Sequence, residues 1–357
     1  MKHSEIFHAW GRILTGRAPS MSIEITKECP LRCPGCYAYE DEHLGGGVTL
    51  RQLSDSRGDQ LVKGVIDVVD HYRPLHLSLV GGDPLVRCRE LEILLPQLNA
   101  RGIFVQVVTS AFRPIPQAWA SLSRLNVVVS IDGLEPEHNE RRKPATYERI
   151  LKNIVGHRVV IHTTITGQTM RREGYWEEFL KFWTPRQEIK KVWFSLFTPQ
   201  RGAPEAPEWL SPEERERVIA DLYRLREQFP KLDMAKALIK EFARPPQSPD
   251  ECIFAKTTLT LSADLRTKVE PCQFGGDPDC SRCGCVASMG LAAVGNHVIV
   301  PGLTAGMIFH ASARVGKMIA KLRAPVPPAP SGEPKSAASA ARAVKLRDGR
   351  QEESLLL

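Results

Sequence analysis

The sequence predicts an α/β protein with an open or partial (β/α)6 barrel, a small cysteine-rich module and a C-terminal helix. Strand-like and helix-like segments alternate about six times from residue 16 onward, which is typical of parallel βαβ units. The pattern changes near residue 244, and most of the cysteines fall into two tight groups. These observations favour a barrel of the TIM type. A doubly wound sheet is the alternative, because periodicity alone does not separate the two.

The barrel is expected over residues 16–243, after an amphipathic lead-in helix within residues 1–15. Short apolar runs rich in β-branched residues are strand candidates at 22–26, 76–80, 104–109, 127–131, 159–165 and 192–197. Helical periodicity fills the intervals at 61–69, 91–98, 147–154 and 176–182. A further helix is predicted over 211–229, because Ser211 is followed by proline and two glutamates, as at a helix start.

The C-terminal part divides into three segments: a cysteine-rich module (244–300), a basic amphipathic helix (301–323) and a tail (324–357) whose composition predicts disorder. The helical pattern is clearest over 303–323. Its apolar arc consists of Met307, Ile308, Ala311, Val315, Met318, Ile319 and Leu322, flanked by Arg314, Lys317 and Lys321. The favoured interpretation is that this arc packs on the barrel. The alternative is that the helix lies on an anionic membrane surface, as a peripheral contact.

Composition narrows the class of protein. The 357 residues carry 48 Lys and Arg against 41 Asp and Glu, a net charge of +7. No basic run is interleaved with aromatic residues, so nucleic acid is not expected as a partner. No run approaches the roughly 20 apolar residues of a membrane span, and the N-terminus lacks the apolar core of a signal peptide. A cytoplasmic protein is therefore expected.

The nine cysteines favour metal binding over disulfides, because eight of them lie at tight spacings. Cys88 stands apart and is interpreted as an ordinary, partly buried thiol. Cys29, Cys33 and Cys36 follow directly on the first predicted strand. Three thiolates can hold three irons of a cubane cluster and leave the fourth iron open. A zinc knuckle is the alternative; it requires a fourth ligand, for which His43 is the nearest candidate.

This cysteine loop, with Tyr37 beside its last cysteine, resembles the radical S-adenosylmethionine (SAM) superfamily. The resemblance extends over roughly residues 16–235. It implies that a [4Fe–4S] cluster on Cys29, Cys33 and Cys36 binds SAM through its amino and carboxylate groups. Electron transfer from the reduced cluster would then cleave SAM, and the 5′-deoxyadenosyl radical would abstract hydrogen from a substrate. An electron donor such as flavodoxin or ferredoxin is implied as a partner.

Two further motifs support the resemblance. Gly81, Gly82 and Asp83 follow the second predicted strand, where the family usually has Gly-Gly-Glu-Pro around the SAM amino group. Asp83 is one methylene shorter than the family's glutamate, and a simple turn is the alternative explanation. Ser130 and Asp132 follow the fourth strand, in a Ser-Ile-Asp-Gly sequence similar to the family's contacts to the SAM ribose or carboxylate. Other candidates in these loops are Thr164, as a SAM contact, and His138, Arg141 and Arg142, without assigned roles.

The second group comprises Cys252, Cys272, Cys280, Cys283 and Cys285. A β-hairpin is predicted between its first two cysteines, over 257–262 and 266–269. This arrangement resembles the SPASM/twitch modules of radical SAM enzymes, which implies one auxiliary [4Fe–4S] cluster and one surplus thiol. A structural zinc site is the alternative.

The substrate is not identified by the sequence. SPASM/twitch relatives mostly modify peptides or proteins, others act on small molecules, and some enzymes of similar size act on isoprenoid lipids. Two other classes of function are weighed against the enzyme. One is a non-catalytic iron–sulfur or zinc binding protein, which the Gly-Gly-Asp and Ser-Ile-Asp-Gly motifs disfavour. The other is a membrane-associated scaffold that acts through the C-terminal helix.

Overall fold

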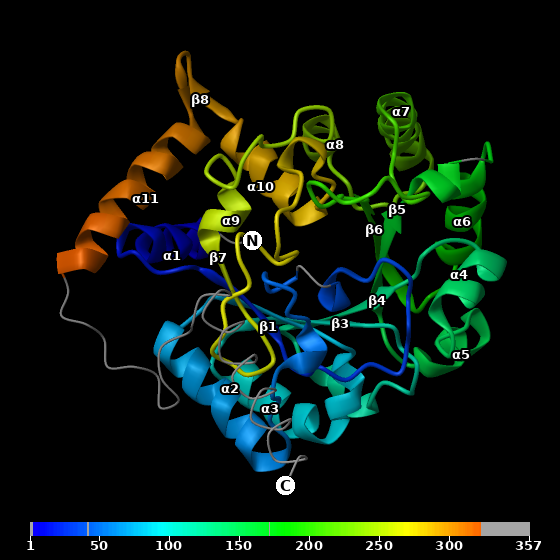
Figure 1. Cartoon of the computed structure of the whole chain (residues 1–357), viewed down its shortest axis with the longest axis horizontal. Coiled ribbons are helices and arrows are strands. Elements are labelled where there is room, and N and C mark those ends of the chain that lie inside the picture. The colour runs from blue at the N-terminus through cyan, green and yellow to red at the C-terminus, as the bar shows by residue number, and fades with distance from the viewer. Residues whose placement is uncertain (1–2, 41–42, 171, 323–357) are drawn as a thin grey trace, which may run out of the picture.

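The computed structural model describes residues 3–40, 43–170 and 172–322, which fold around one curved sheet (Figure 1). The sheet has seven strands in the order β6-β5-β4-β3-β2-β1-β7, and all neighbours are parallel. The strands are β1 (Ser20–Glu24), β2 (His76–Val80), β3 (Phe104–Thr109), β4 (Leu125–Ser130), β5 (Val159–Ile165), β6 (Ile189–Leu196) and β7 (Thr258–Leu261). The open, partial barrel predicted from the sequence is confirmed.

A seventh strand, β7, lies inside the segment 244–300 and extends the barrel sheet. Thr258 aligns with Ser20 of β1, and Leu261 aligns with Ile23. The predicted hairpin forms only in part. Its second arm meets β7 through one bridge, between Leu261 and Lys268, and does not form a strand.

Helices cover the outside of the curved sheet. They are α2 (Gly58–Tyr72), α3 (Cys88–Ala100), α4 (Glu135–Arg142), α5 (Tyr147–Asn153), α6 (Tyr175–Trp183) and α7 (Pro212–Gln228). Side chains alternate between the two faces of each strand. In β5, Val159, Ile161 and Ile165 join the hydrophobic core under the helices, which leaves His162 and Thr164 on the inner face of the barrel. The predicted helix start at Ser211 is confirmed by a capping box with Glu214.

The remaining elements lie beside β1 and β6. They are α1 (His3–Leu14), α8 (Lys236–Glu241), α9 (Ile253–Thr257), α10 (Val286–Gly295), the hairpin of β8 (Val298–Val300) and β9 (Leu303–Thr304), and α11 (Ala305–Leu322). The lead-in helix is confirmed as α1, and Cys88 is buried at the start of α3. None of the described helices is long and apolar enough to cross a membrane. The predicted tail, 324–357, lies outside the described residues.

The packing of α11 is the reverse of the favoured expectation. Its buried residues are Gly306, Phe309, Ser312 and Gly316, whereas most of the predicted apolar arc faces outward. The cause is a close crossing with α1. A Cβ on Gly316 would lie 2.0 Å from the carbonyl oxygen of Ile13, so only glycine permits this approach. The small residues of α11 therefore face the protein.

Candidate active site

The first cysteine group lies on the loop that leaves the C-terminal end of β1. Cys29, Cys33 and Cys36 are free thiols and are half-buried. Burial raises the pKa of all three, that of Cys29 to about 12. Such thiols stay protonated near neutral pH unless a metal displaces the proton, because a metal ligand must be a thiolate. Three thiols on one loop are a donor set that fits three irons of a cluster.

A buried arginine anchors this loop. Arg87 donates to Glu28 at 3.1 Å and to Asp55 at 2.9 Å. Asp55 also accepts bonds from the Thr26 hydroxyl at 2.8 Å and the Lys27 backbone N–H at 3.1 Å. Because Arg87 follows the Gly-Gly-Asp motif in the chain, the network ties that motif to the cysteine loop.

The two predicted glycines are required by direct contact with the first strand and the cysteine loop. Gly81 has φ of +86°, and a Cβ there would lie 2.6 Å from Cα of Glu24. A Cβ on Gly82 would lie 2.0 Å from the carbonyl oxygen of Glu28, which accepts the backbone N–H of Asp83 at 2.8 Å. The motif is therefore more than a turn, because it fixes the cysteine loop against the end of β2.

The Asp83 carboxylate has partners that the sequence did not predict. It is buried and accepts hydrogen bonds from the Thr109 hydroxyl at 2.6 Å, from the Ser110 N–H and hydroxyl at 2.8 and 2.5 Å, and from Leu85 N–H at 3.0 Å. The carboxylate thus joins β2 to the end of β3. This geometry differs from the expected contact between the Asp83 carboxylate and the SAM amino group.

A charged network faces the cysteine loop from the end of β4. Asp132 accepts from Arg142 at 2.7 and 3.1 Å and from Arg141 at 3.0 Å. Burial alone would raise the pKa of Asp132, but the charges of Arg142 and Arg141 lower it to about 2. The positive charge of Arg142 also acts to lower the pKa of Cys33 and Cys36, against the larger effect of their burial. The structure therefore brings Asp132 and both arginines together with the cysteines.

The other residues predicted in these loops have different surroundings. Ser130 and Thr164 are partly exposed at the ends of β4 and β5, and their hydroxyls have no hydrogen-bond partner among the described residues. His138 is buried; its Nδ1 accepts from Asp132 N–H at 3.1 Å, and its Nε2 donates to the Ala145 carbonyl at 2.8 Å. His138 therefore shapes the loop, whereas the two hydroxyls are open to a ligand.

One inner-face residue was missed by the sequence reasoning. His162 Nε2 lies 2.8 Å from the Ser195 hydroxyl, which accepts the Val286 N–H at 3.2 Å. Burial lowers the pKa of His162 to about 4, so the imidazole is neutral at physiological pH. The available signal was its two-residue spacing from Thr164 within the predicted strand, which places both side chains on the same face.

His43 does not serve as a fourth ligand to the first cysteine group. Its Nδ1 donates to the Phe274 carbonyl at 2.9 Å, and its Nε2 lies 2.6 Å from Glu24. Glu24 also accepts from the Ser262 hydroxyl at 2.5 Å. Both imidazole nitrogens are occupied, which removes the ligand that the zinc-knuckle alternative needed. We call this buried group the Glu24–His43–Ser262 link, since it joins β1 to the cysteine-rich module.

Tyr37 lies beside this link. Its ring makes edge contacts with His43 and Phe274, at centroid distances of 5.6 and 5.5 Å. Burial is the largest cause that raises the pKa of Tyr37. Nearby negative charges raise this pKa further, among them Glu24 and the thiolate forms of Cys36 in the first group and Cys285 in the second. Tyr37 therefore lies between the two cysteine groups. Its predicted contact with SAM stays a prediction.

The second cysteine group lines one small cavity of about 20 Å³, to which Cys252, Cys272, Cys280, Cys283 and Cys285 all contribute. All are free thiols; burial raises the pKa of Cys272 to about 12 and that of Cys280 to about 11. Cys252 is hydrogen-bonded to Ser288 at 3.2 Å. Among the described residues, no three His, Cys, Asp or Glu side chains lie close enough together to hold a single metal ion.

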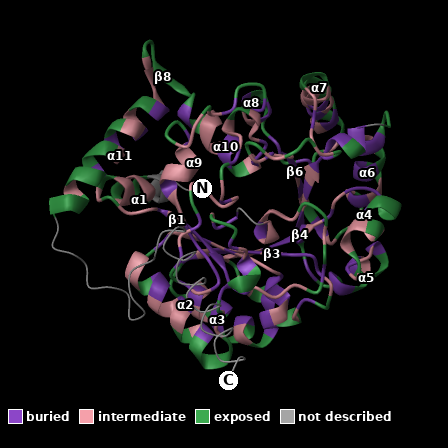
Figure 2. Ribbon diagram, viewed as in Figure 1, coloured by how far each residue is buried: buried purple, intermediate pink, exposed green. Residues whose placement is uncertain are grey.

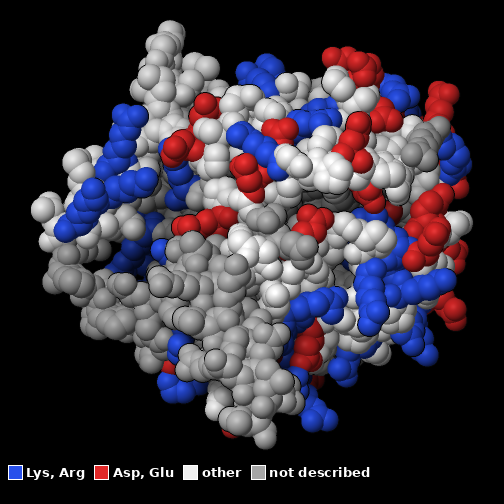
Figure 3. Space-filling view, viewed as in Figure 1, with Lys and Arg blue, Asp and Glu red and all other residues white. Residues whose placement is uncertain are grey.

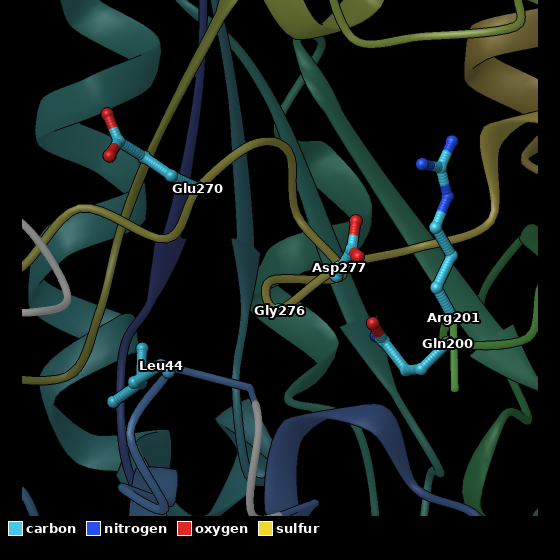
Figure 4. A pocket seen from close by; sticks show the side chains of 7 residues that line it. Leu44, Gln200, Arg201, Glu270, Gly276 and Asp277 are labelled. Carbon is cyan, nitrogen blue, oxygen red and sulfur yellow. The ribbon is translucent and has the colours of Figure 1, made fainter. Parts of the chain in front are cut away.

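A larger cavity, of about 410 Å³, opens between the loop after the first cysteine group and the cysteine-rich module (Figure 4). It is lined by Leu44, Gly45, Gln200, Arg201, Glu270, Gly276 and Asp277. Gln200 donates to the Gly275 carbonyl at 3.3 Å, while its amide oxygen is buried without a partner among the described residues. Figure 4 shows Arg201 extending away from Gln200, and Glu270 on the opposite side. Charges of both signs therefore line the cavity, and Gln200 lies in its wall with a buried amide oxygen.

Several solved structures share this fold. Streptococcus suis SuiB bound to S-adenosylmethionine matches with a TM-score of 0.52 and 16% identity, over 73% of this chain and 62% of that chain. SuiB bound to precursor peptide SuiA matches with 0.54 and 14%, over 76% and 63%. Native anSMEcpe with bound AdoMet matches with 0.53 and 16%, over 71% and 75%. At these identities the likeness shows the fold alone.

The sequence comparisons address the same region of the chain. A 7-carboxy-7-deazaguanine synthase from Hyperthermus butylicus is 29% identical over 102 residues, which are 29% of this chain and 39% of that protein. The chain thus matches well under half the length of this curated relative. A family model described as the Radical SAM superfamily matches residues 23–182, which hold the cysteine loop, the Gly-Gly-Asp motif and Asp132. Residues 23–182 therefore form a radical SAM domain, which supports an enzyme of the radical SAM class.

Proposed function

We propose that the protein binds a [4Fe–4S] cluster through Cys29, Cys33 and Cys36 and cleaves SAM reductively there. When bound, such a cluster supplies the electron that converts SAM to methionine and a 5′-deoxyadenosyl radical, which abstracts hydrogen from the substrate. The observation that carries the proposal is the contact between the cysteine loop and the Gly81–Gly82 turn, with Asp132 and its arginines opposite. The electron would come from a carrier such as flavodoxin or ferredoxin.

The chain's own residues would then hold SAM between the two motifs. The open hydroxyls of Ser130 and Thr164 can donate to the ribose or the carboxylate. Arg142 places a positive charge beside Cys33 and Cys36, which suits a SAM carboxylate and offsets the negative charge of bound thiolates. Because the Asp83 carboxylate is already bonded to β3, recognition of the amino group falls to backbone carbonyls of the Gly-Gly-Asp turn.

The test is anaerobic reconstitution with iron and sulfide, followed by reduction and addition of SAM. We expect 5′-deoxyadenosine from the wild-type protein and none from Cys29→Ala, Cys33→Ala or Cys36→Ala. Cys88→Ala is the matched control, because this thiol lies on α3 apart from both groups, and it should keep the activity. A fully loaded wild-type cluster that yields no 5′-deoxyadenosine with any reductant would contradict the proposal.

We also propose that the second cysteine group binds an auxiliary [4Fe–4S] cluster, as in a SPASM/twitch module. A tetrahedral zinc ion needs sulfurs about 3.8 Å apart, given Zn–S bonds of about 2.3 Å. A cubane binds each thiolate through a different iron and so holds the sulfurs further apart. Five thiols around one cavity can supply the four ligands of a cubane, which supports the cluster.

Metal analysis of the Cys29→Ala/Cys33→Ala/Cys36→Ala triple variant separates the two metals. About four irons and four sulfides per chain are expected to remain, since the auxiliary cluster is independent of the first. Stoichiometric zinc without iron would instead support the structural zinc site. Single Cys→Ser variants of the five module cysteines then identify the surplus thiol, as the one variant that keeps the full iron content.

We further propose that the substrate, a peptide, a protein or a small molecule, enters through the cavity of about 410 Å³. The unpaired Gln200 amide oxygen supports a substrate that donates a hydrogen bond, such as an amide or amine. Gln200→Ala should weaken substrate-dependent formation of 5′-deoxyadenosine and leave substrate-free cleavage of SAM unchanged. Equal loss of both activities would indicate that Gln200 supports the folded structure and does not bind the substrate. A cytoplasmic location stays a prediction.

A further inference from the structure

One side of the molecule gathers apolar side chains that the fold leaves uncovered. We call it the α1–α11 face; it consists of α1, the β8–β9 hairpin and the outer side of α11 (Figures 1 and 2). Its most exposed members are Phe7, Val298, Ile299, Val300, Met307, Val315, Met318 and Leu322. Of the twelve exposed large hydrophobic side chains among the described residues, nine lie on α1, the hairpin or α11; the other three are Ile93, Val155 and Val294. Exposure is therefore concentrated on this face.

The outward direction of these side chains is imposed by packing. Gly16 and Gly316 meet at the crossing of α1 and α11, where added Cβ atoms would lie 2.5 and 2.0 Å from backbone oxygens of the opposite segment. Phe309 and Ser312 continue the buried side of α11. Since the small residues must face α1, the methionines and valine of the helix point away from the protein. Exposed apolar side chains that gather on one side of a protein are typical of an interaction site.

The hairpin and α11 carry only basic charges. Arg314, Lys317 and Lys321 are exposed along α11. Figure 3 shows basic side chains in blue where Figure 1 places α11, beside the uncharged hairpin. No Asp or Glu occurs between residues 280 and 322. Beside α1, burial and the charges of Arg17 and Arg73 lower the pKa of Arg12, so further cations gather there. An anionic partner would complement this basic surface.

The shape of the face also suits a flat, apolar, anionic partner. The hairpin projects beyond the end of α11 with Val298, Ile299 and Val300 all at least half exposed. The helix offers a row of apolar side chains along its length, and its basic residues flank that row. Apolar groups in the headgroup region with Lys and Arg beside them are the pattern of helices that lie in a membrane interface. Since no described helix can cross a bilayer, contact would be peripheral.

We propose that the α1–α11 face docks the protein on an anionic lipid bilayer. The hairpin tip and the outer row of α11 enter the boundary between headgroups and acyl chains. Arg314, Lys317 and Lys321 contact the acidic headgroups, whose negative surface potential attracts basic residues near the membrane. This inference does not depend on the chemistry of the cysteine groups.

The test is cosedimentation of the full chain with vesicles of phosphatidylcholine alone or with about a third phosphatidylglycerol. We expect binding at least tenfold tighter to the anionic vesicles, weakened at 0.5 M salt because the charges become screened. Ile299→Ser/Met318→Ser should lower binding to anionic vesicles at least tenfold. The matched control is Ile93→Ser/Val155→Ser, which removes two equally exposed apolar side chains elsewhere and should bind as the wild type does.

Three results would overturn the proposal. The first is wild-type protein that stays in the supernatant with both vesicles. The second is equal binding by the two double variants, since the apolar face would then contribute nothing. The third is a dimer in light scattering that dissociates in Ile299→Ser/Met318→Ser without any lipid binding, because a second copy would then be the partner. Iron content of each variant, compared with the wild type, checks that the substitutions leave the fold intact.

Discussion

Replacement of Glu24 separates the charge of the Glu24–His43–Ser262 link from its hydrogen bonds. Glu24→Ala removes the partner of the His43 Nε2 and of the Ser262 hydroxyl, and all three side chains are almost fully buried. Breaking a buried pair on one side costs about 3–5 kcal/mol. At about 2 °C per kcal/mol for a chain of this size, the midpoint of thermal unfolding should fall by about 6–10 °C.

Glu24→Gln should cost much less. The His43 Nδ1 proton is held by the Phe274 carbonyl, so a neutral His43 can accept a hydrogen bond from the new amide through Nε2. The amide oxygen can still accept from Ser262. A fully bonded neutral pair replaces a charged one, and we expect a loss of only about 1 kcal/mol.

The raised pKa of His43 also predicts how the stability of the protein changes with pH. Burial lowers the pKa of His43, but the charge and hydrogen bond of Glu24 outweigh it and raise the pKa above 6.5. The imidazolium pair therefore contributes its full stability below pH 6.5 and loses it as pH rises through the raised pKa. The wild-type protein should lose more stability between pH 6 and pH 9 than Glu24→Gln does. Anaerobic thermal unfolding at both pH values measures this.

The control is Glu178→Gln, which removes an exposed partner of Arg172 and should shift the midpoint by less than about 2 °C. Two results together would refute the reasoning: Glu24→Gln unfolds at the same temperature as Glu24→Ala, and it keeps the wild-type change between pH 6 and pH 9. The link would then have no role as a charged, hydrogen-bonded unit.

Two more substitutions test the site itself. Gly82→Ala places a Cβ 2.0 Å from the Glu28 carbonyl oxygen, so the cysteine loop must move. The iron content of the reconstituted protein should then fall by about half or more. Gly11→Ala, whose Cβ would have no atom within 4 Å, should keep the wild-type iron content. Asp132→Asn removes the charge that orients two arginines, and SAM should bind about tenfold more weakly in equilibrium titration. Asp70→Asn, which weakens one exposed pair, should leave the affinity unchanged, and an equal loss in both would contradict the assignment.

Local sequence patterns predicted the six barrel strands well. The bounds of β2, β3 and β5 agree with the predicted runs at 76–80, 104–109 and 159–165, because each is a short run in which buried apolar residues recur at every second position. The pattern did not place β7. Thr258–Leu261 was identified as extended, but a short segment carries no information on which neighbour it pairs with.

In the candidate site, too, the sequence predicted local features but not the partners that residues find across strands. The closeness of the cysteine loop and the Gly-Gly-Asp turn follows from parallel strands that end at one edge, and the structure has them in contact. The partners of Asp83 and His162 depend on how neighbouring strands align, and no local pattern encodes that alignment. For α11 the periodicity predicted the helix but not its inner side. A hydrophobic pattern predicts which side chains avoid water. The inner side of α11 is instead set by close backbone contact, because only glycine at position 316 lets α11 approach α1.

The pairing of β1 with β7 also has a consequence for synthesis of the chain. The Ser262 hydroxyl and the Glu24 carboxylate that it meets are 238 residues apart in sequence. The outer edge of β1 thus remains unpaired on the ribosome until most of the chain has emerged, and contacts of such separation form slowly. An open edge invites pairing with other chains. A nascent chain that stops before residue 258 should therefore need a chaperone, and expression of the barrel without its cysteine-rich module should give aggregated protein.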